Sequence, residues 1–337
     1  MCPDVEALFL SFRTRALSGS EDRDKLVLEI FRYQARHNPI YAAYIKHLNR
    51  SPEEIYNLQD IPFLPIEMFR HFLIQTHSYS PEIVFQSSGT TQIQRSQHAI
   101  DKLSFYESLC QRSFEDHYGP LSKYTLYTLL PTYRENPKSS LLYMIKHFLS
   151  QAHTGKNMWD NYQGAFTLLK ESVPQTMVWG LPQSLFNFSE EWLKQANPKS
   201  IPRSDTVFIE TGGMKQGNPT LSKEEIYHRL HTTWQIKGVQ SEYGMTECLS
   251  QAYGIEGIFS PPPWMYVQIR DLSDPFSYLP PGEQGGINII DMMNIHSCCF
   301  LETQDRGRLT PPFEKGDFEV LGRVQDAPAR GCHMLMN

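Results

Sequence analysis

Hydrophobic positions recur along this chain with two different periods. In the N-terminal part, apolar side chains return every three or four residues, as they do on one face of a helix. This spacing predicts amphipathic helices over residues 5–17 and 24–48, and prolines then interrupt the pattern before Phe69. The chain therefore begins with a helical segment.

Further along the chain, short apolar runs typical of buried strands alternate with helical stretches. The predicted strands cover residues 83–85, 124–130, 176–179, 206–209, 286–290 and 318–321, and the clearest helices cover 102–114, 140–149 and 223–234. Clusters of proline and glycine predict loops between Tyr253 and Gly286. The alternation predicts an α/β fold, without an internal repeat or a clear linker before about residue 321.

Composition excludes some classes of protein. A chain of 337 residues that is 40% hydrophobic can bury a large core in one large domain or two ordinary ones. The net charge is −6 with the two signs interspersed, which argues against nucleic acid as the main partner. There is no run of 18 apolar residues, and acids stand where a signal peptide would carry positive charge. We expect a cytoplasmic protein without an integral membrane segment.

The cysteines fit that expectation. None of the six has C-x-x-C spacing, and no His and Cys cluster has the spacing of zinc ligands. Most are expected to be reduced thiols in the core. Cys332 differs, because it lies in a terminal tail with glycine and charged neighbours, and such tails are usually exposed.

Two distant runs carry the candidate chemistry. FQSSGTTQIQRS contains the small or hydroxyl residues Ser87, Ser88, Gly89, Thr90 and Thr91, whose backbone and hydroxyl groups can wrap phosphate oxygens. SEYGMTECLSQAYG presents Tyr243, Thr246 and Glu247, an aromatic, a hydroxyl and a carboxylate. Together they suit ATP with Mg²⁺. Each alone has a plain alternative: a Ser/Thr-rich turn, or a strand-to-helix turn with a buried tyrosine.

The pair of runs resembles the phosphate loop and the Tyr-Gly-x-Thr-Glu motif of the acyl-adenylate-forming superfamily, which includes acyl-CoA synthetases. Other stretches narrow the resemblance to the LuxE-type acyl-protein synthetases, relatives of phenylacetate-CoA ligases. These stretches are IPFLPIEMFRHF, LLPTYRENPKSSLLYMIKHFL, VFIETGGMKQG, SCCFLETQDRGRL and GRVQDAPARGC, and they follow the family order over residues 55–337.

The resemblance implies the large N-terminal domain of adenylate-forming enzymes, with stacked sheets flanked by helices. This domain would occupy residues 1–321, and residues 322–337 would form a short tail in place of the small C-terminal domain. No lysine follows Leu321, so a catalytic lysine from that small domain is not expected. A rebuilding of the site around CoA is not expected either.

Residue roles follow from the same resemblance. The 87–91 loop would hold the triphosphate, although Gln92 stands where glycine is common. Tyr243 would stack on adenine, and Glu247 would bind Mg²⁺. The remaining matched positions are Thr246 for the α-phosphate, Gly212, Gly213 and Gly244 for close backbone approach, Asp305 for the ribose hydroxyls, Arg323 as the arginine that follows it, and Lys215 for the phosphates.

Plainer interpretations stay open for several of these residues. Asp305 could form a turn, the glycines could serve turns, and Lys215 could be a solvated surface charge. His98 could contact substrate or be structural. Candidates for the missing cation are Arg95, Lys215, Arg306 and Arg323.

In the LuxE-type family the acyl group passes to a cysteine near the C-terminus, and Cys332 in ARGCHMLMN matches that position. Arg330 and His333 flank it and could lower the pKa of its thiol. The alternative is an incidental terminal cysteine. The resemblance implies that residues 179–182, 243–245 and 253–259 form walls of the acyl pocket, although most of these side chains could equally be core.

The sequence thus predicts ATP-dependent activation of a carboxylic acid, expected to be a fatty acid, with Mg²⁺ as the metal. The acyl group would pass to Cys332 and then to a partner protein such as an acyl reductase. One alternative is a CoA ligase of the phenylacetate type. The other is a non-catalytic homologue that binds nucleotide.

Overall fold

The computed structural model describes residues 3–19, 22–88, 94–159, 161–170, 175–195, 206–212 and 222–324. The chain forms two compact units. Unit 1 comprises Met1–Leu109, Met245–Ser250 and Ser260–Asn337, and unit 2 comprises Cys110–Gly244 and Gln251–Phe259. The chain passes from one unit to the other inside the Tyr-Gly-x-Thr-Glu motif. The predicted boundary at residue 321 stays a prediction.

Unit 1 begins with three helices, α1 (Pro3–Ser18), α2 (Arg23–His37) and α3 (Pro39–His47). The single helix predicted over residues 24–48 is therefore wrong, because it breaks at Asn38. Proline at the first position of α3 disfavours helical backbone in the residue before it, and Asn38 is extended. The Asn38 side chain accepts a hydrogen bond from the Tyr41 amide at 3.1 Å, which caps α3.

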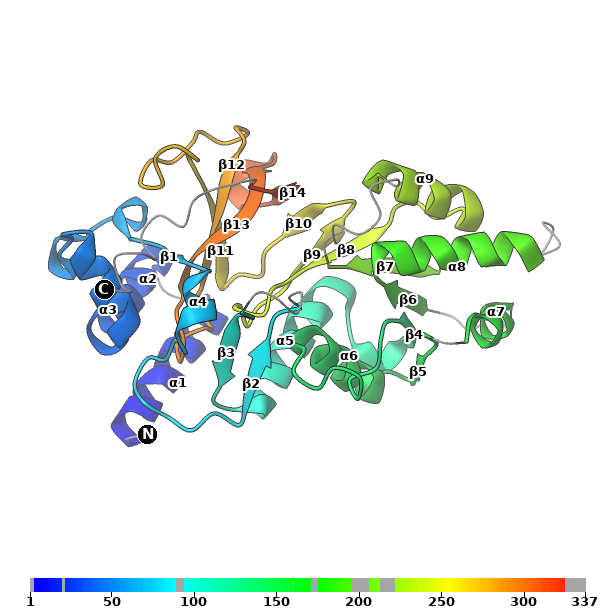
Figure 1. Cartoon of the computed structure of the whole chain (residues 1–337), viewed down its shortest axis with the longest axis horizontal. Helices are drawn as coiled ribbons and strands as arrows, with labels where there is room; N and C mark the ends of the chain where they lie inside the picture. The colour runs from blue at the N-terminus through cyan, green and yellow to red at the C-terminus, as the bar shows by residue number, and fades with distance from the viewer. Residues whose placement is uncertain are drawn as a thin grey trace. The chain divides into compact units, whose positions relative to one another are not determined.

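Four antiparallel strands follow each other across the sheet of unit 1 (Figure 1): β11 (Met265–Arg270), β12 (Gly285–Asp291), β13 (Phe300–Leu309) and β14 (Phe318–Arg323). The short β1 (Leu64–Pro65) pairs with β13, and α4 (Met68–His71) follows it. β2 (Ile83–Gln86) and β3 (Gln97–Ile100) form a separate two-stranded sheet. The region that the sequence predicted to be loops thus contains the strand β11, in which buried and half-buried residues alternate. The sequence analysis missed this strand because prolines surround it.

In unit 2, the neighbouring parallel strands are β5 (Thr154–Asn157), β4 (Thr125–Leu129), β6 (Thr176–Gly180), β7 (Val207–Thr211) and β8 (Gln240–Tyr243). β9 (Ala252–Ile255) and β10 (Ile258–Ser260) follow in the sheet order, with β9 antiparallel to β8. The helices are α5 (Leu103–Tyr118), which starts in unit 1, α6 (Ser140–Gln151), α7 (Tyr162–Lys170), α8 (Pro182–Gln195) and α9 (Lys223–Trp234). The α/β prediction is confirmed, while α7, α8, β5, β8, β9 and β10 were not predicted.

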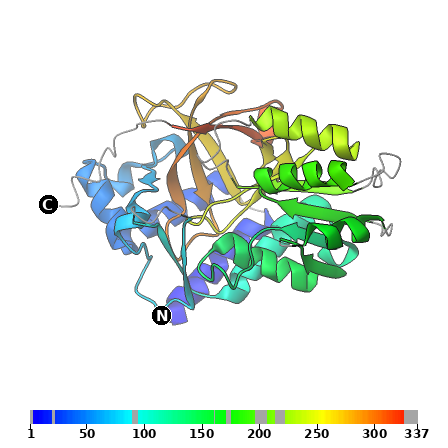
Figure 2. The same ribbon diagram turned by 45° about the vertical axis from the view of Figure 1, so that its right-hand side comes forward.

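Two aromatic layers sandwich the sheet of unit 2. Helices α8 and α9 lie side by side on one face, and α6 lies on the other (Figures 1 and 2). On the α8 and α9 face, the Phe188 and Trp234 rings stack at 5.4 Å, and the Trp234 indole donates a hydrogen bond to Ser189 at 2.7 Å. On the other face, Trp179 packs against Phe114 and Phe148. Burial of this aromatic area is the main favourable term in the folding of such a sheet.

In unit 1, buried polar side chains hold the turn between β12 and β13. The Gln34 amide of α2 donates to the carbonyl of Ile295 at 2.9 Å and accepts from the amide of Cys299 at 2.9 Å. Asn38 donates to the carbonyl of Ser297 at 2.8 Å, and the Thr76 hydroxyl donates to the same oxygen at 2.7 Å. The turn is fully buried, so its backbone groups need these partners.

Cys110, Cys248, Cys298 and Cys299 are free and buried, which confirms the prediction of reduced core thiols for these four; Cys2 and Cys332 lie outside the described residues. In the part of the chain that the structure describes, no helix combines the length and apolar character needed to cross a bilayer.

Replacing Gln34 by leucine is expected to lower the free energy of unfolding by about 2–4 kcal/mol, because it leaves several buried backbone groups unsatisfied. Urea unfolding followed by tryptophan fluorescence measures the change. The control is Gln59→Leu at an exposed position. A Gln34→Leu protein as stable as this control would contradict the role assigned to Gln34.

The pH dependence of unfolding should report His296. Burial, with Arg13 and His77 adding to it, lowers the pKa of His296 to about 3, whereas the unfolded chain titrates near 6.5. The unfolded state then binds more protons between these values, so stability falls as pH falls from 6.5 toward 3, by up to about 1.4 kcal/mol per pH unit. Chemical denaturation from pH 7 to pH 4 should show a shallower decline in His296→Gln. The exposed His47→Gln should keep the slope of the natural protein.

Candidate functional site

The two ends of the predicted phosphate loop are fixed side by side in unit 1. The Ser87 amide donates to the carbonyl of Ser96 at 3.1 Å, and the Ser96 amide donates to the Ser87 hydroxyl at 3.1 Å. These bonds extend the pairing of β2 with β3. Ser88 is exposed, while Gly89, Thr90, Thr91 and Gln92 lie outside the described residues. The structure therefore describes the stem of the loop.

The Glu247 carboxyl group meets this stem. Its side chain is only 4% exposed, and burial raises its pKa. A hydrogen bond from the Ser96 hydroxyl and the positive charges of Arg70 and Arg323 act in the opposite direction. The site thus contains a buried acid that accepts a hydrogen bond from one hydroxyl and feels the charge of two arginines, and Glu247 meets the stem of the loop within unit 1.

Other buried side chains hold the backbone around Glu247. His98 Nδ1 lies 2.7 Å from the carbonyl oxygen of Thr246, and its Nε2 lies 3.0 Å from Asn294 Oδ1. The Asn294 amide nitrogen donates to the carbonyl oxygens of Glu247 at 2.7 Å and Cys298 at 2.9 Å. Of the two interpretations of His98, the structure supports the structural one, because both ring nitrogens face oxygens inside unit 1.

His98 is a buried histidine whose pKa is lowered to about 4 by burial, with its two hydrogen bonds partly opposing the shift. It is 1% exposed. Such a group is neutral at physiological pH and unsuited to accept a proton from substrate. Its function here is to position the carbonyl of Thr246. The Thr246 side chain is half-buried.

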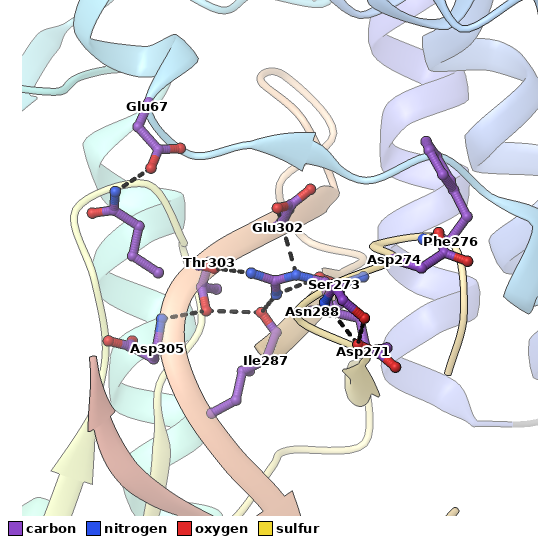
Figure 3. Close-up of polar contacts among 12 residues, drawn as sticks. Glu67, Asp271, Ser273, Asp274, Phe276, Ile287, Asn288, Glu302, Thr303 and Asp305 are labelled. Atoms are coloured by element: carbon purple, nitrogen blue, oxygen red, sulfur yellow. Dashed lines mark hydrogen bonds and ion pairs between the residues drawn. The ribbon is translucent and has the colours of Figure 1, made fainter. Parts of the chain in front are cut away.

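Asp305 and Arg323 face each other across β13 and β14. They are register partners, and Arg323 Nε lies 3.7 Å from Asp305 Oδ1. The Asp305 amide donates to the Thr303 hydroxyl at 3.1 Å (Figure 3). Because Arg323 also acts on Glu247, the predicted ribose contact and the predicted metal ligand share one arginine.

A buried arginine fixes this part of β13. Arg270 donates to the carbonyl of Thr303 at 2.7 Å and, through its other terminal nitrogen, to the carbonyl of Ile287 at 2.9 Å; Glu302 lies 3.5 Å from its Nε (Figure 3). Burial lowers the pKa of Arg270, and Glu302 opposes that shift. With its donors on backbone carbonyls, Arg270 stabilises the sheet and is not a cation for a ligand.

Arg70 was missed by the sequence analysis. It lies on α4, in the IPFLPIEMFRHF stretch that served only as a marker of resemblance. Three other residues were candidates for the missing cation. Arg95 is half-buried, Arg306 is exposed, and Lys215 lies outside the described residues. The stretch gave no signal of this role beyond the presence of an arginine in it.

In unit 2, Tyr243 ends β8 and is 9% exposed, with its ring 5.5 Å from that of Phe259. Gly244 follows, and a Cβ there would come 2.5 Å from Glu242 Oε1, so any other residue would require the Glu242 side chain to shift. Gly212 follows β7 with φ of +78°, a backbone conformation that favours glycine. Gly213 and Cys332 lie outside the described residues.

Magnesium is compatible with this arrangement. Among the described residues, no group of three or more His, Cys, Asp or Glu side chains gathers as a metal site. Mg²⁺ in nucleotide sites is usually held by one or two carboxylates together with substrate phosphates. A single carboxylate such as Glu247 beside a phosphate loop fits that donor set.

Neither the family models nor the curated proteins include a match to this chain. Solved structures do match. An open conformation of 2-hydroxyisobutyryl-CoA ligase in complex with 2-HIB-AMP and CoA aligns with a TM-score of 0.66 at 14% identity, over 90% of this chain and 70% of that one. The postadenylation state of the same ligase gives 0.65 at 15% identity, over 90% and 68%.

ATP-bound MatB from Rhodopseudomonas palustris aligns with a TM-score of 0.53 at 14% identity. The match covers 71% of this chain and 47% of MatB, so the chain spans about half the length of that protein. At such identities the likeness establishes the fold. The chain has the mixed α/β fold of adenylate-forming ligases, with a large sheet flanked by helices.

Proposed function

We propose that this protein activates a carboxylic acid with ATP, forming an acyl-adenylate and pyrophosphate. The observation that carries the proposal is the contact of Glu247 with Ser96, beside Arg70 and Arg323. It joins the stem of a hydroxyl-rich loop to a buried carboxyl group, the pairing that a metal-bound triphosphate requires. The shared fold supports the proposal, since solved neighbours hold 2-HIB-AMP or ATP.

In the reaction, an oxygen of the acid attacks the α-phosphorus of ATP, and the bond to the β-phosphate oxygen breaks. The protein must place the two reactants in line and offset the negative charge. Residues 87–91 would hold the triphosphate, and the Thr246 hydroxyl would bind the α-phosphate. Arg70 and Arg323 would supply positive charge in place of a lysine.

Glu247 would bind Mg²⁺, which would neutralise phosphate charge as a Lewis acid. The Ser96 hydroxyl orients the carboxyl group, and His98 and Asn294 fix the backbone on either side of it. Asp305 would bind the ribose hydroxyls, with Arg323 at its side. For Tyr243, Gly212, Gly213, Gly244 and Lys215, the roles implied by the sequence resemblance stay proposals.

The second half of the proposal is acyl transfer. The Cys332 thiolate would attack the acyl carbonyl carbon and release AMP, and the resulting thioester would pass the acyl group to a partner such as an acyl reductase. Support comes from the terminal sequence, where Arg330 and His333 can favour the thiolate. A CoA ligase is the second candidate function, because the structurally similar 2-hydroxyisobutyryl-CoA ligase was solved in complex with CoA.

Glu247→Gln is expected to lower the acid-dependent ATP/pyrophosphate exchange by on the order of 100-fold, because the metal loses its charged ligand. Exchange of radiolabelled pyrophosphate at several Mg²⁺ concentrations measures this. Glu314→Gln, at an exposed position, is the charge-matched control. Equal exchange rates in Glu247→Gln and in this control would show that Glu247 is not part of the ATP site. Absence of exchange in the natural protein would reject adenylation.

Cys332→Ala is expected to keep pyrophosphate exchange within about two-fold and to lose covalent acylation, because the thiol acts only after adenylation. Intact-protein mass measurement after incubation with ATP and acids detects the acyl group. Acylation that persists in Cys332→Ala would show that another residue accepts it. Acyl-CoA formed by this variant when CoA is added would favour the CoA ligase.

A further inference from the structure

Two buried glutamates lie on neighbouring strands of unit 2, at the carboxyl end of its parallel sheet. Glu210 is on β7 and Glu242 on β8, and they are 4% and 8% exposed. In open α/β sheets this end of the strands is where ligands bind. Glu210 pairs with Ser241 in the register, whereas Glu242 pairs with Thr211 and with Tyr253 of β9. Cross-strand partners share a face, so the two glutamates point to opposite faces.

Glu210 has three partners within the protein, and all of them contact its Oε1. Its carboxylate lies 3.0 Å from Lys223 Nζ, and it accepts hydrogen bonds from the hydroxyls of Tyr227 at 2.8 Å and Ser241 at 2.9 Å. Lys223 and Tyr227 belong to α9, so this glutamate ties the helix to the sheet. A buried acid with one cation and two hydroxyl donors has a structural explanation.

Glu242 has much less support. The Thr211 hydroxyl donates to Oε2, and Oε1 has no hydrogen-bond partner among the described residues. Oε1 lies beside Gly244, which is exposed, and an ideal Cβ on Gly244 would come 2.5 Å from this oxygen. Burial, and less so the charge of Glu210, raises the pKa of Glu242 to about 7. A buried acid with a single hydroxyl donor and no cation among the described residues costs stability, which calls for a functional reason.

The same face carries further buried groups without a partner. The Tyr253 hydroxyl, next to Glu242 in the register, has no hydrogen-bond partner among the described residues, although the residue is only 2% exposed. Trp179 of β6 is fully buried, and its indole nitrogen also has no hydrogen-bond partner among the described residues. Glu242 also acts on the pKa of Tyr253, which burial raises. Glu242 and Tyr253 are thus register partners on one face of the sheet, and the Tyr253 hydroxyl has no partner among the described residues.

We propose that Glu242, Thr211 and Tyr253 form a subsite for a hydroxyl or amino substituent on the acid that the protein activates. The inference rests on the proposed function. Glu242 directly precedes Tyr243 and Gly244, the predicted nucleotide contacts, so a group bonded to Oε1 belongs to the molecule that becomes joined to AMP. The substrate class is a carboxylic acid with a hydrogen-bond donor, and an unsubstituted fatty acid would offer no partner to Glu242 Oε1 or to the Tyr253 hydroxyl.

The test is acid-dependent ATP/pyrophosphate exchange with acids of equal carbon number that are unsubstituted, hydroxylated or aminated at the second or third carbon. The natural protein should show a kcat/KM at least about 100-fold higher for a hydroxylated or aminated acid, because a site built for a donor rejects the analogue that lacks it. Which of the two is preferred separates hydroxyl from amine.

Glu242→Leu should lower kcat/KM for the preferred acid by about 100-fold or more and leave the unsubstituted acid unchanged or improved. Tyr253→Phe removes only a hydroxyl and should reduce the preference by several-fold. Glu224→Leu, on the exposed surface of α9, should match the natural protein. If Glu242→Leu does not fold, the acid preference of the natural protein and of Tyr253→Phe still decides.

Equal exchange with substituted and unsubstituted acids would overturn the subsite and leave acid activation intact. A preference for substituted acids that Tyr253→Phe and Glu242→Leu both retain would also overturn it, because recognition would then lie elsewhere. Absence of exchange with every acid would instead reject the proposed function, and the subsite with it.

Discussion

The buried turn between β12 and β13 is the constraint on which the candidate site of unit 1 depends. Asp291, at the end of β12, is fully buried and accepts hydrogen bonds from the amides of Leu249 and Ser250, each at 2.9 Å, and from the Ser250 hydroxyl at 2.7 Å. Burial raises the pKa of Asp291, while these bonds favour its charged form. A buried carboxylate tolerates this position only because donors surround it. The segment that carries Glu247 is therefore anchored at its far end.

Asn294 anchors the near end of the same segment. Its amide bridges the carbonyls of Glu247 and Cys298, so the turn and the motif share one side chain. Gln34 and Asn38, near the start of the chain, donate hydrogen bonds to backbone carbonyls of this turn. Glu247 thus owes its position to residues of α2 and to the residue between α2 and α3, far away in sequence. Such buried networks are rigid when all their members are satisfied, which suits a site that must hold a charge in place.

Periodicity and motif spacing were sufficient for the class of fold, whereas the roles assigned to the site residues stay predictions. The β4, β6 and β7 strands and the α9 helix lie where the apolar patterns predicted them, because these are long, strongly patterned elements. The meeting of Ser87 and Ser96 with Glu247 was anticipated only in outline. It depends on the pairing of β2 with β3 and on the Asn294 bridge, and neither has a local signal.

The misses have physical causes. The break at Asn38 was visible in the Asn-Pro dipeptide, but the apolar spacing continues through it and concealed the cap. β11 was hidden among prolines because strands are specified by their partners, here β12, as much as by their own residues. Arg70 could not be assigned a role because its relation to Glu247 exists only after folding. The division into two units was equally hidden, since the chain changes unit between Gly244 and Met245 without a linker.

Glu210 and Glu242 show why the chemistry of a side chain is not a property of its sequence neighbourhood. Both follow strand-forming residues, both are buried, and both lie near a glycine. Strand alternation sends one toward Lys223 and Tyr227 of α9 and the other toward Thr211 and Tyr253. The first forms an ion pair and has two hydroxyl donors, whereas the second has a single hydroxyl donor and no cation among the described residues. Because a buried acid needs donors or a cation to offset its loss of hydration, the same residue type stabilises the fold on one face and can bind a polar ligand on the other.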